Sequence, residues 1–264
     1  MLHFPDRDAN KEATAVSDTL TPASADAFPV TPRNRVKRMH ERGSYDKHAI
    51  FAILDAALLC HVAYVLEDGQ PFCTPTLFWR EGETLYWHGS SASRMLKHLK
   101  TGTRACLTVS HLDGLVLARS GFHHSVNYRS AMCFGTARFV EDEAEKRRAL
   151  EHLVDRFYPG RTATLRPIQP QEFKATTVIK MEIEDASAKV RAKTVADDEE
   201  DYALPLWAGV IPVTQVIGAA EPCPRLIPGT TRPDNLSAYR PGRRLDETFT
   251  EMQQAYEPAE VEIR

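Results

Sequence analysis

One stretch decides how this chain is interpreted, and it reads Leu115-Val-Leu-Ala-Arg-Ser-Gly-Phe-His-His-Ser-Val-Asn-Tyr-Arg-Ser130. An apolar strand segment runs directly into two histidines, two arginines, an asparagine and a tyrosine. If these groups filled a core, each of them would need a buried hydrogen-bonding partner. The stretch therefore predicts a strand that leads into a ligand site, and its polar groups suit an anionic, aromatic ligand.

Short strand-like runs repeat on both sides of this stretch. Asp68-Gly69 and Asp113-Gly114 are hairpin turn signals. The predicted strands cover residues 61–66, 72–79, 84–88, 104–110, 114–119, 127–140 and 176–183, and the predicted helices cover residues 46–59, 91–99 and 143–157. The tight connections leave no room for the helical crossovers of a parallel sheet. The pattern predicts a mainly β (α+β) fold, a closed or half-closed antiparallel barrel with flanking helices.

The composition divides the chain into three parts. Residues 1–32 are rich in Ala, Asp, Thr, Pro and Ser without any period, and we expect a disordered leader there. Residues 33–217 contain the predicted strands and form the barrel domain. Residues 218–264 turn to Pro, Arg, Gly and Asp, which predicts an extended C-terminal arm with a short helix near residues 245–256.

Bulk properties exclude several classes of function. A net charge of −3 gives no general attraction to nucleic acid or to anionic membranes. No apolar run approaches the roughly 20 residues that span a bilayer, and the N-terminus lacks the apolar region of a secretory signal. The five cysteines are odd in number and include no Cys-x-x-Cys pair. We therefore expect a reduced, cytoplasmic protein with buried thiols.

A phosphate site is predicted where the third strand leads into a helix. Gly89 permits close backbone approach, Ser90 and Ser93 supply hydroxyls, and Arg94 adds a cation. The start of a helix also directs free N–H groups at an anion. In the alternative interpretation, Ser90 or Ser91 merely caps the helix. Capping explains one serine, but not the glycine, the second serine and the arginine together.

His123 and His124 are the candidates for donating a proton. Adjacent residues on a strand point in opposite directions, so they seldom ligate one ion together, and no acidic residue is near in sequence to complete a metal site. We therefore expect no metal. A neutral histidine that lines the ligand site is favoured, and a merely hydrogen-bonded histidine is the alternative.

Other polar groups of the same region suit a ligand that carries carbonyls, ring nitrogens or phosphate. Asn127, Arg119 and Arg129 offer amide and guanidinium donors, and a salt-bridge role on the barrel rim is the alternative for the arginines. Trp207 lies in an apolar segment, where it either packs in the core or walls a ligand or subunit interface.

Three segments together carry a resemblance to a known family. They are Tyr86-Trp-His-Gly-Ser-Ser-Ala-Ser-Arg94, His123-His-Ser-Val-Asn-Tyr-Arg-Ser130 and Trp207-Ala-Gly-Val-Ile-Pro212. Their order and spacing resemble the pyridoxamine 5'-phosphate oxidase-like family, specifically its nitroimidazole-resistance-related branch. This resemblance implies a six-stranded split β-barrel that forms a homodimer, with FMN bound at the subunit interface.

The resemblance also implies roles for individual residues. One strand runs along the isoalloxazine ring, the next strand end holds the ribityl phosphate, and the partner subunit completes the site. The strand along the ring is Cys73, Thr74, Pro75 and Thr76. The residues that hold the phosphate are His88, Gly89, Ser90, Ser93 and Arg94. The residues from the partner subunit are Asn127, Tyr128, Arg129 and Trp207.

By this resemblance the chain is an FMN-dependent oxidoreductase. It acts on a small molecule such as a nitro-aromatic or quinone-like acceptor, with NADH or NADPH as the donor. True pyridoxamine-phosphate oxidases carry a basic pair where Arg94 is followed here by Met95, and a C-terminal Trp–Arg clamp that this chain does not show clearly. Oxidation of pyridoxamine phosphate is therefore not expected. The alternative function is a non-catalytic flavin- or haem-binding protein that serves in storage or sensing.

Overall fold

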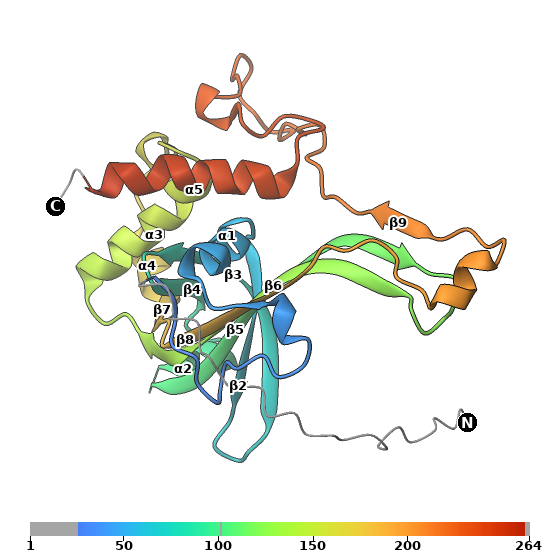
Figure 1. The fold of residues 1–264 in the computed structure, drawn as a ribbon. Coiled ribbons are helices and arrows are strands. Elements are labelled where there is room, and N and C mark those ends of the chain that lie inside the picture. Colours follow the sequence, from blue (N-terminus) through green and yellow to red (C-terminus); the bar gives the residue numbers. More distant parts are fainter. Residues whose placement is uncertain (1–25, 101, 262–264) are drawn as a thin grey trace.

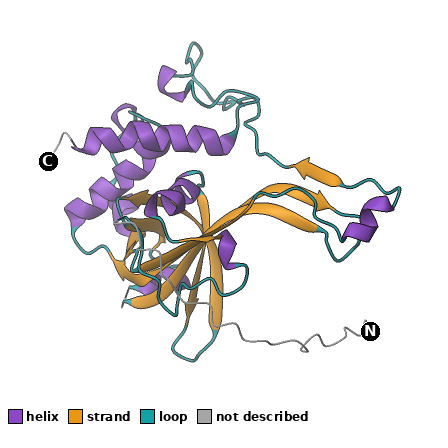
Figure 2. Ribbon diagram, viewed as in Figure 1, coloured by secondary structure: helices purple, strands orange, loops and turns teal. Residues whose placement is uncertain are grey.

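The centre of the molecule is a closed ring of six antiparallel strands (Figures 1 and 2). The structure is a computed structural model that describes residues 26–100 and 102–261. The ring strands are β2 (Leu59–Val65), β3 (Pro71–Glu81), β4 (Thr84–Ser90), β5 (Thr103–Leu117), β6 (Ser125–Phe139) and β7 (Thr176–Glu182). They pair in the order β2-β3-β4-β7-β6-β5, and β5 returns to β2. This arrangement confirms the predicted split-barrel class.

Alternation of side chains explains why these segments close into a barrel. Along β2, Val62 points inward and is fully buried, whereas its neighbour His61 is exposed. Leu107 lies opposite Val62 on β5 and is also fully buried. Because successive strand residues face opposite sides, one apolar set fills the interior.

Five α-helices flank the barrel. They are α1 (Lys47–Asp55), α2 (Arg94–Leu99), α3 (Glu143–Phe157), α4 (Pro170–Ala175) and α5 (Leu245–Val261). Short 3₁₀ turns connect other segments and comprise η1 (His40–Arg42), η2 (Thr162–Thr164), η3 (Glu199–Ala203) and η4 (Asp234–Leu236). A second apolar cluster, which includes Trp79, Phe157 and Phe249, joins the outside of the barrel to α3 and α5. None of the described helices is long and apolar enough to cross a bilayer.

The prediction of a hairpin at Asp113-Gly114 is wrong. β5 runs through this point as one strand, with an irregular register between Leu112 and Gly114. A side chain at Gly114 would meet the carbonyl oxygen of Ile211 at 3.2 Å, so glycine serves close strand approach here and not a turn. The β5–β6 pair therefore extends beyond the barrel as a long hairpin (Figure 1).

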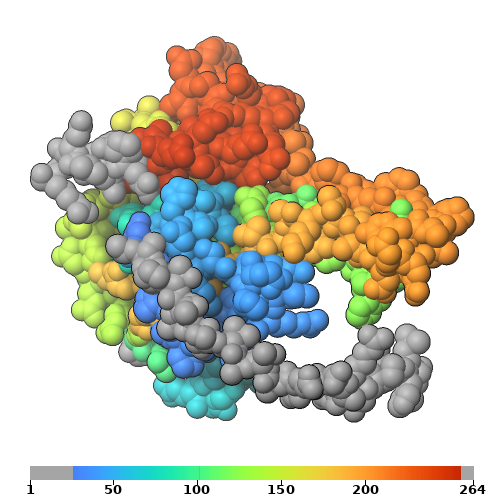
Figure 3. Space-filling model, viewed as in Figure 1, coloured from blue at the N-terminus to red at the C-terminus, as the bar shows by residue number. Residues whose placement is uncertain are grey.

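Three further strands were not predicted from the sequence. The two-residue β1 (Gly43–Ser44) pairs with β8 (Asp185–Arg191), and β8 pairs with β6. β9 (Gly209–Pro212) pairs with the extended part of β5. We call the β5–β6 hairpin beyond the barrel, together with residues 192–212 beside it, the arm; Figure 3 shows that its orange and green parts project from the body of the molecule.

Residues on both sides of the predicted barrel domain pack against it. Residues 1–25 of the predicted leader lie outside the described residues, but Phe28 is buried and its N–H donates to the Tyr45 carbonyl at 2.9 Å. The folded part therefore begins before residue 33. At the other end, the predicted short helix is α5, and its Phe249 is buried against the ring of Phe157 on α3. The helical part of the predicted C-terminal segment (residues 218–264) thus packs on the folded body.

Candidate functional site

The barrel is split along one edge of β3. Residues 71–77 of β3 pair with β2, but β3 pairs with β4 only over residues 78–81. β4 pairs with β7 over its whole length, but beyond Trp87 it has no pairing with β3. The Phe78 N–H donates to the Leu58 carbonyl oxygen, on the β2 side of the strand. Backbone polar groups of successive strand residues point to opposite sides, so those of Cys73 and Leu77 point away from β2 and into the split. Pro75 fits such an edge because proline has no N–H to pair.

The second lip of the split is the end of β4 with the start of α2. Ser93 is the N-cap of α2, yet its side chain makes no capping hydrogen bond. The Ser90 hydroxyl accepts from the Ala92 N–H at 3.2 Å. The Arg94 guanidinium lies 4.1 Å from the ring centroid of Phe72 on β3. This contact brings the predicted phosphate residues and the predicted ring-contacting strand to one place.

His88 adds a buried nitrogen without a partner to this lip. Its Nδ1 atom has no hydrogen bond to any described residue. Burial lowers the pKa of His88, so its imidazole stays neutral at pH 7. Gly89 follows, where a side chain would contact Leu96 of α2 at 3.1 Å. An unpartnered buried nitrogen costs stability until a ligand or water supplies its hydrogen bond.

The remaining predicted residues lie on the arm and not at the split of the same chain. His123 places Nε2 at 3.3 Å from the Asp198 carboxylate, and His124 Nδ1 is 2.8 Å from the Ser120 carbonyl oxygen. Trp207 is 68% exposed, so it is not a core residue within one chain. The single chain therefore presents two separate groups of candidate residues.

Asn127 and its neighbour Tyr128 are held within the arm. The Asn127 amide oxygen accepts from Arg191 at 2.6 Å, and its nitrogen donates to the Lys193 carbonyl at 3.0 Å. Tyr128 is paired across the strands with Leu112 on one side and Arg191 on the other. In one chain these residues stabilise the arm.

Arg119 and Arg129 both form salt bridges within the chain, as in the alternative role given to them from the sequence. Arg119 donates to Asp197 at 3.0 Å. Arg129 holds Asp113 through two hydrogen bonds of 3.0 and 2.8 Å and also donates to Asp246 at 3.0 Å. The bonds to Asp113, ahead of those to Asp246, raise the pKa of Arg129 despite its partial burial.

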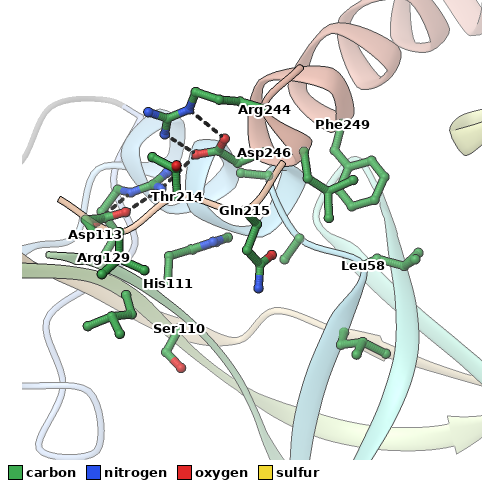
Figure 4. Close-up of a pocket in the computed structure, with 16 residues that line it drawn as sticks. Leu58, Ser110, His111, Asp113, Arg129, Thr214, Gln215, Arg244, Asp246 and Phe249 are labelled. Atoms are coloured by element: carbon green, nitrogen blue, oxygen red, sulfur yellow. Dashed lines mark hydrogen bonds and ion pairs between the residues drawn. The ribbon is translucent and has the colours of Figure 1, made fainter. Parts of the chain in front are cut away.

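Arg129 also lines a cavity of about 380 Å³ that sequence reasoning missed (Figure 4). The cavity lies between the end of α1, β5 and the first turn of α5, and Asp246 and Arg244 contribute to its polar wall. Since 117 residues separate Arg129 from Asp246, no local pattern could have linked them. Among residues 26–100 and 102–261, no group of three or more His, Cys, Asp or Glu side chains could hold a metal ion.

Comparisons with known proteins agree with this geometry. A family model described as pyridoxamine 5'-phosphate oxidase matches residues 46–190. The flavocytochrome Anf3 from Azotobacter vinelandii is 47% identical, with 80% of this chain and 98% of that chain covered and a TM-score of 0.75. An FAD- and haem-binding protein from Mycobacterium smegmatis is 37% identical, with 77% and 98% covered and a TM-score of 0.72. No curated protein matches the chain. The chain therefore belongs to the pyridoxamine 5'-phosphate oxidase-like family of split β-barrels.

Proposed function

We propose that this protein is a flavin-binding oxidoreductase that exchanges electrons with a small molecule. The observation that carries the proposal is the 47% identity, over 80% of the chain, to a flavocytochrome. The split supports the same conclusion because it joins an unpaired strand edge to a set of anion-binding groups. FMN is the flavin expected from the sequence, and FAD is the flavin named for the Mycobacterium smegmatis relative.

The residues of the split fit a flavin. Backbone groups of Cys73 and Leu77 would meet the hydrogen-bonding edge of the ring, while Ser93 and Arg94 would hold phosphate oxygens. The unpartnered Nδ1 of His88 lies on the strand that ends at this site. When bound, a flavin supplies the hydride or electron transfer, and the protein binds and orients it. NADH or NADPH is the proposed donor.

We also propose a homodimer in which each arm completes the partner's site. Phe122 and Trp207 on the arm are 86% and 68% exposed, and Leu59 on the outer face of β2 is 64% exposed. Exposed aromatic residues of this kind are typical anchors of subunit interfaces. Such a dimer would bring His123 or His124 to a flavin, where either one could donate a proton. Sedimentation should give twice the chain mass, and Trp207→Ser should shift it toward the monomer.

An absorbance spectrum of the purified protein tests the flavin proposal. We expect flavin bands at about one flavin per chain, and chromatography of the released chromophore distinguishes FMN from FAD. Arg94→Ala should weaken flavin binding tenfold or more, because it removes a charge-assisted contact to phosphate. Lys97→Ala on the exposed side of the same helix is the matched control and should bind normally. If the purified protein contains no flavin and takes up neither FMN nor FAD, the proposal is wrong.

Haem is the second proposed cofactor. Two relatives that each match more than three quarters of the chain are a flavocytochrome and an FAD- and haem-binding protein. A Soret band beside the flavin bands would establish a flavin–haem protein. If haem is present but no acceptor is reduced with NADH or NADPH, the alternative of a non-catalytic storage or sensing protein takes precedence.

A further inference from the structure

A half-open pocket lies where the C-terminal helix meets the barrel, and Leu59 and Leu112 in its lining are 64% and 48% exposed. Its floor is residues 56–59, at the end of α1 and the start of β2, one side is residues 110–113 of β5, and its cover is residues 213–215 with the first turn of α5. We call this space of about 380 Å³ the α5 chamber. The volume suits a molecule of one or two aromatic rings.

The walls of the α5 chamber differ in polarity. Leu58 and Phe249 lie on one side, and a network of two arginines and two aspartates lies on the other (Figure 4). An aromatic ring opposite an aliphatic side chain binds flat apolar molecules, while a few polar groups fix their orientation.

The aspartates of the polar wall are hydrogen-bonded through both carboxylate oxygens, whereas the arginines keep unused donors. Asp246 accepts from Arg129, from Arg244 twice and from the Glu247 N–H, so its lone pairs are used. Both oxygens of Asp113 accept from Arg129. The Nη1 groups of Arg129 and Arg244 form no hydrogen bond or ion pair with any described residue and retain their N–H donors. The two arginines therefore keep donors available, and the acceptors of the two aspartates are taken. The polar side chains of Ser110, His111, Thr214 and Gln215 also line the chamber.

The chamber adjoins the end of the split. Leu59, which lines the chamber, is the cross-strand partner of Leu77 at the end of the unpaired β3 edge. Leu58, also in the lining, accepts the N–H of Phe78, the next residue of β3. The chamber thus begins where the proposed flavin edge ends.

We propose that the α5 chamber binds a flat, uncharged molecule with a conjugated ring and hydrogen-bond acceptors on its rim, of the quinone class. The apolar side holds the ring, and the remaining guanidinium donors bind its carbonyl oxygens. The two arginines also disfavour cationic ligands, and the occupied aspartates offer such ligands little in return. This inference rests on the proposed function, because it assigns a place to the small molecule that exchanges electrons with the flavin.

Equilibrium dialysis of the full chain with duroquinone tests the proposal. Duroquinone has no free ring position that the exposed thiols of Cys73 and Cys223 could attack. Durene carries the same four methyl groups on a flat six-carbon ring but has no carbonyl oxygens, and it should bind at least tenfold more weakly. Arg244→Gln should weaken duroquinone binding about tenfold through the loss of a charged donor. Arg243→Gln is the matched control, because Arg243 pairs with Glu251 and does not line the chamber, and binding should stay within twofold.

A second variant guards against a folding defect in the first. Ser110 is an exposed residue on the chamber wall, so Ser110→Trp should fill the space and abolish duroquinone binding, whereas Ser110→Ala should not. Equal binding of duroquinone and durene, or full binding by Ser110→Trp, would overturn the inference. Dialysis before and after flavin removal separates the two proposals. Duroquinone binding by a protein that never takes up flavin would refute the proposed function alone, and flavin uptake without duroquinone binding would refute the chamber alone.

Discussion

Asp246 in the first turn of α5 accepts a hydrogen bond of 3.0 Å from Arg129 on β6, across 117 residues of chain. Arg129 also binds Asp113 at the bulge of β5, and Arg244, which directly precedes α5, donates to Asp246 at 2.8 Å. The C-terminal helix is therefore attached to the root of the arm by charge-assisted hydrogen bonds. Within one chain Arg129 thus joins two parts of the fold, and its contact with a cofactor across the subunit interface stays a prediction.

The ion pairs of Asp246 predict a pH-dependent contribution to stability. Hydrogen bonds from Arg244 and then Arg129 lower the pKa of Asp246 to about 2, against the opposing effect of burial. An unfolded aspartate has a pKa of about 3.9. Because the folded-state pKa is depressed, this stabilisation is fully present above about pH 4 and is lost as the pH falls through about 2.

Asp246→Asn should therefore lower the free energy of unfolding by about 1 kcal/mol at pH 7, a modest value because solvent still screens the pair. The difference from the unmutated protein should shrink between pH 4 and pH 2, as measured by urea unfolding. Glu221→Gln, an exposed acidic residue of the C-terminal segment, is the control and should show no difference at any pH. A constant deficit across the range would mean that charge is not the cause.

A buried ion cluster under α1 predicts a larger effect. Asp55 accepts two hydrogen bonds from Arg80, at 2.8 and 2.6 Å, and lies 3.6 Å from Arg156, which also bonds Gln253 of α5. Asp55→Ala would remove the carboxylate that Arg80 binds and that lies beside Arg156. We expect a loss of about 3–5 kcal/mol in the free energy of unfolding. Asp55→Asn keeps an acceptor and should lose less, and a loss below 1 kcal/mol for Asp55→Ala would contradict the cluster's role.

Gly135 marks the point where β6 passes from β8 to β7. A Cβ there would lie 2.2 Å from the Glu182 carbonyl oxygen and 2.7 Å from Met181 Cγ. Gly135→Ala must therefore displace backbone, and we expect about 3 kcal/mol of destabilisation or a failure to fold, by analogy with overpacked cores. Gly121→Ala has open space around it and should melt like the unmutated protein. Thermal denaturation followed by circular dichroism distinguishes the two.

The cysteines should differ strongly in reactivity toward Ellman's reagent. Burial raises the pKa values of Cys60 and Cys133, and both thiols are fully enclosed. Cys73 and Cys223 are exposed. Because the thiolate is the reactive form, the latter two should react rapidly in flavin-free protein, and the former two only after unfolding. Bound flavin should slow the reaction of Cys73 with the reagent but not that of Cys223. Mass spectrometry of the labelled peptides identifies the modified residues, and early modification of Cys60 or Cys133 would contradict the prediction.

Local pattern was informative where one element contains its own signal. The helix at Glu143–Phe157 matches its prediction because Asp142 caps its start, with its side chain accepting from the Glu145 N–H. The Asp113-Gly114 prediction failed because the same dipeptide serves a turn or a bulge, and only the partner strand decides between them. The residues predicted to hold phosphate lie beside β3, as the contact of Arg94 with Phe72 shows, and their role in binding stays a prediction.

The sequence alone determined the alternating strands, the main helices and the family motifs, because each depends on neighbours within a few residues. Only the tertiary structure decided that β6 contacts β5, β7 and β8, that Arg129 is held by Asp113 and Asp246, and that a chamber forms under α5. These features depend on the register of distant strands and on ion pairs between segments up to 117 residues apart. Loop closure brings such segments together, and no local periodicity records which partner a charged side chain will meet.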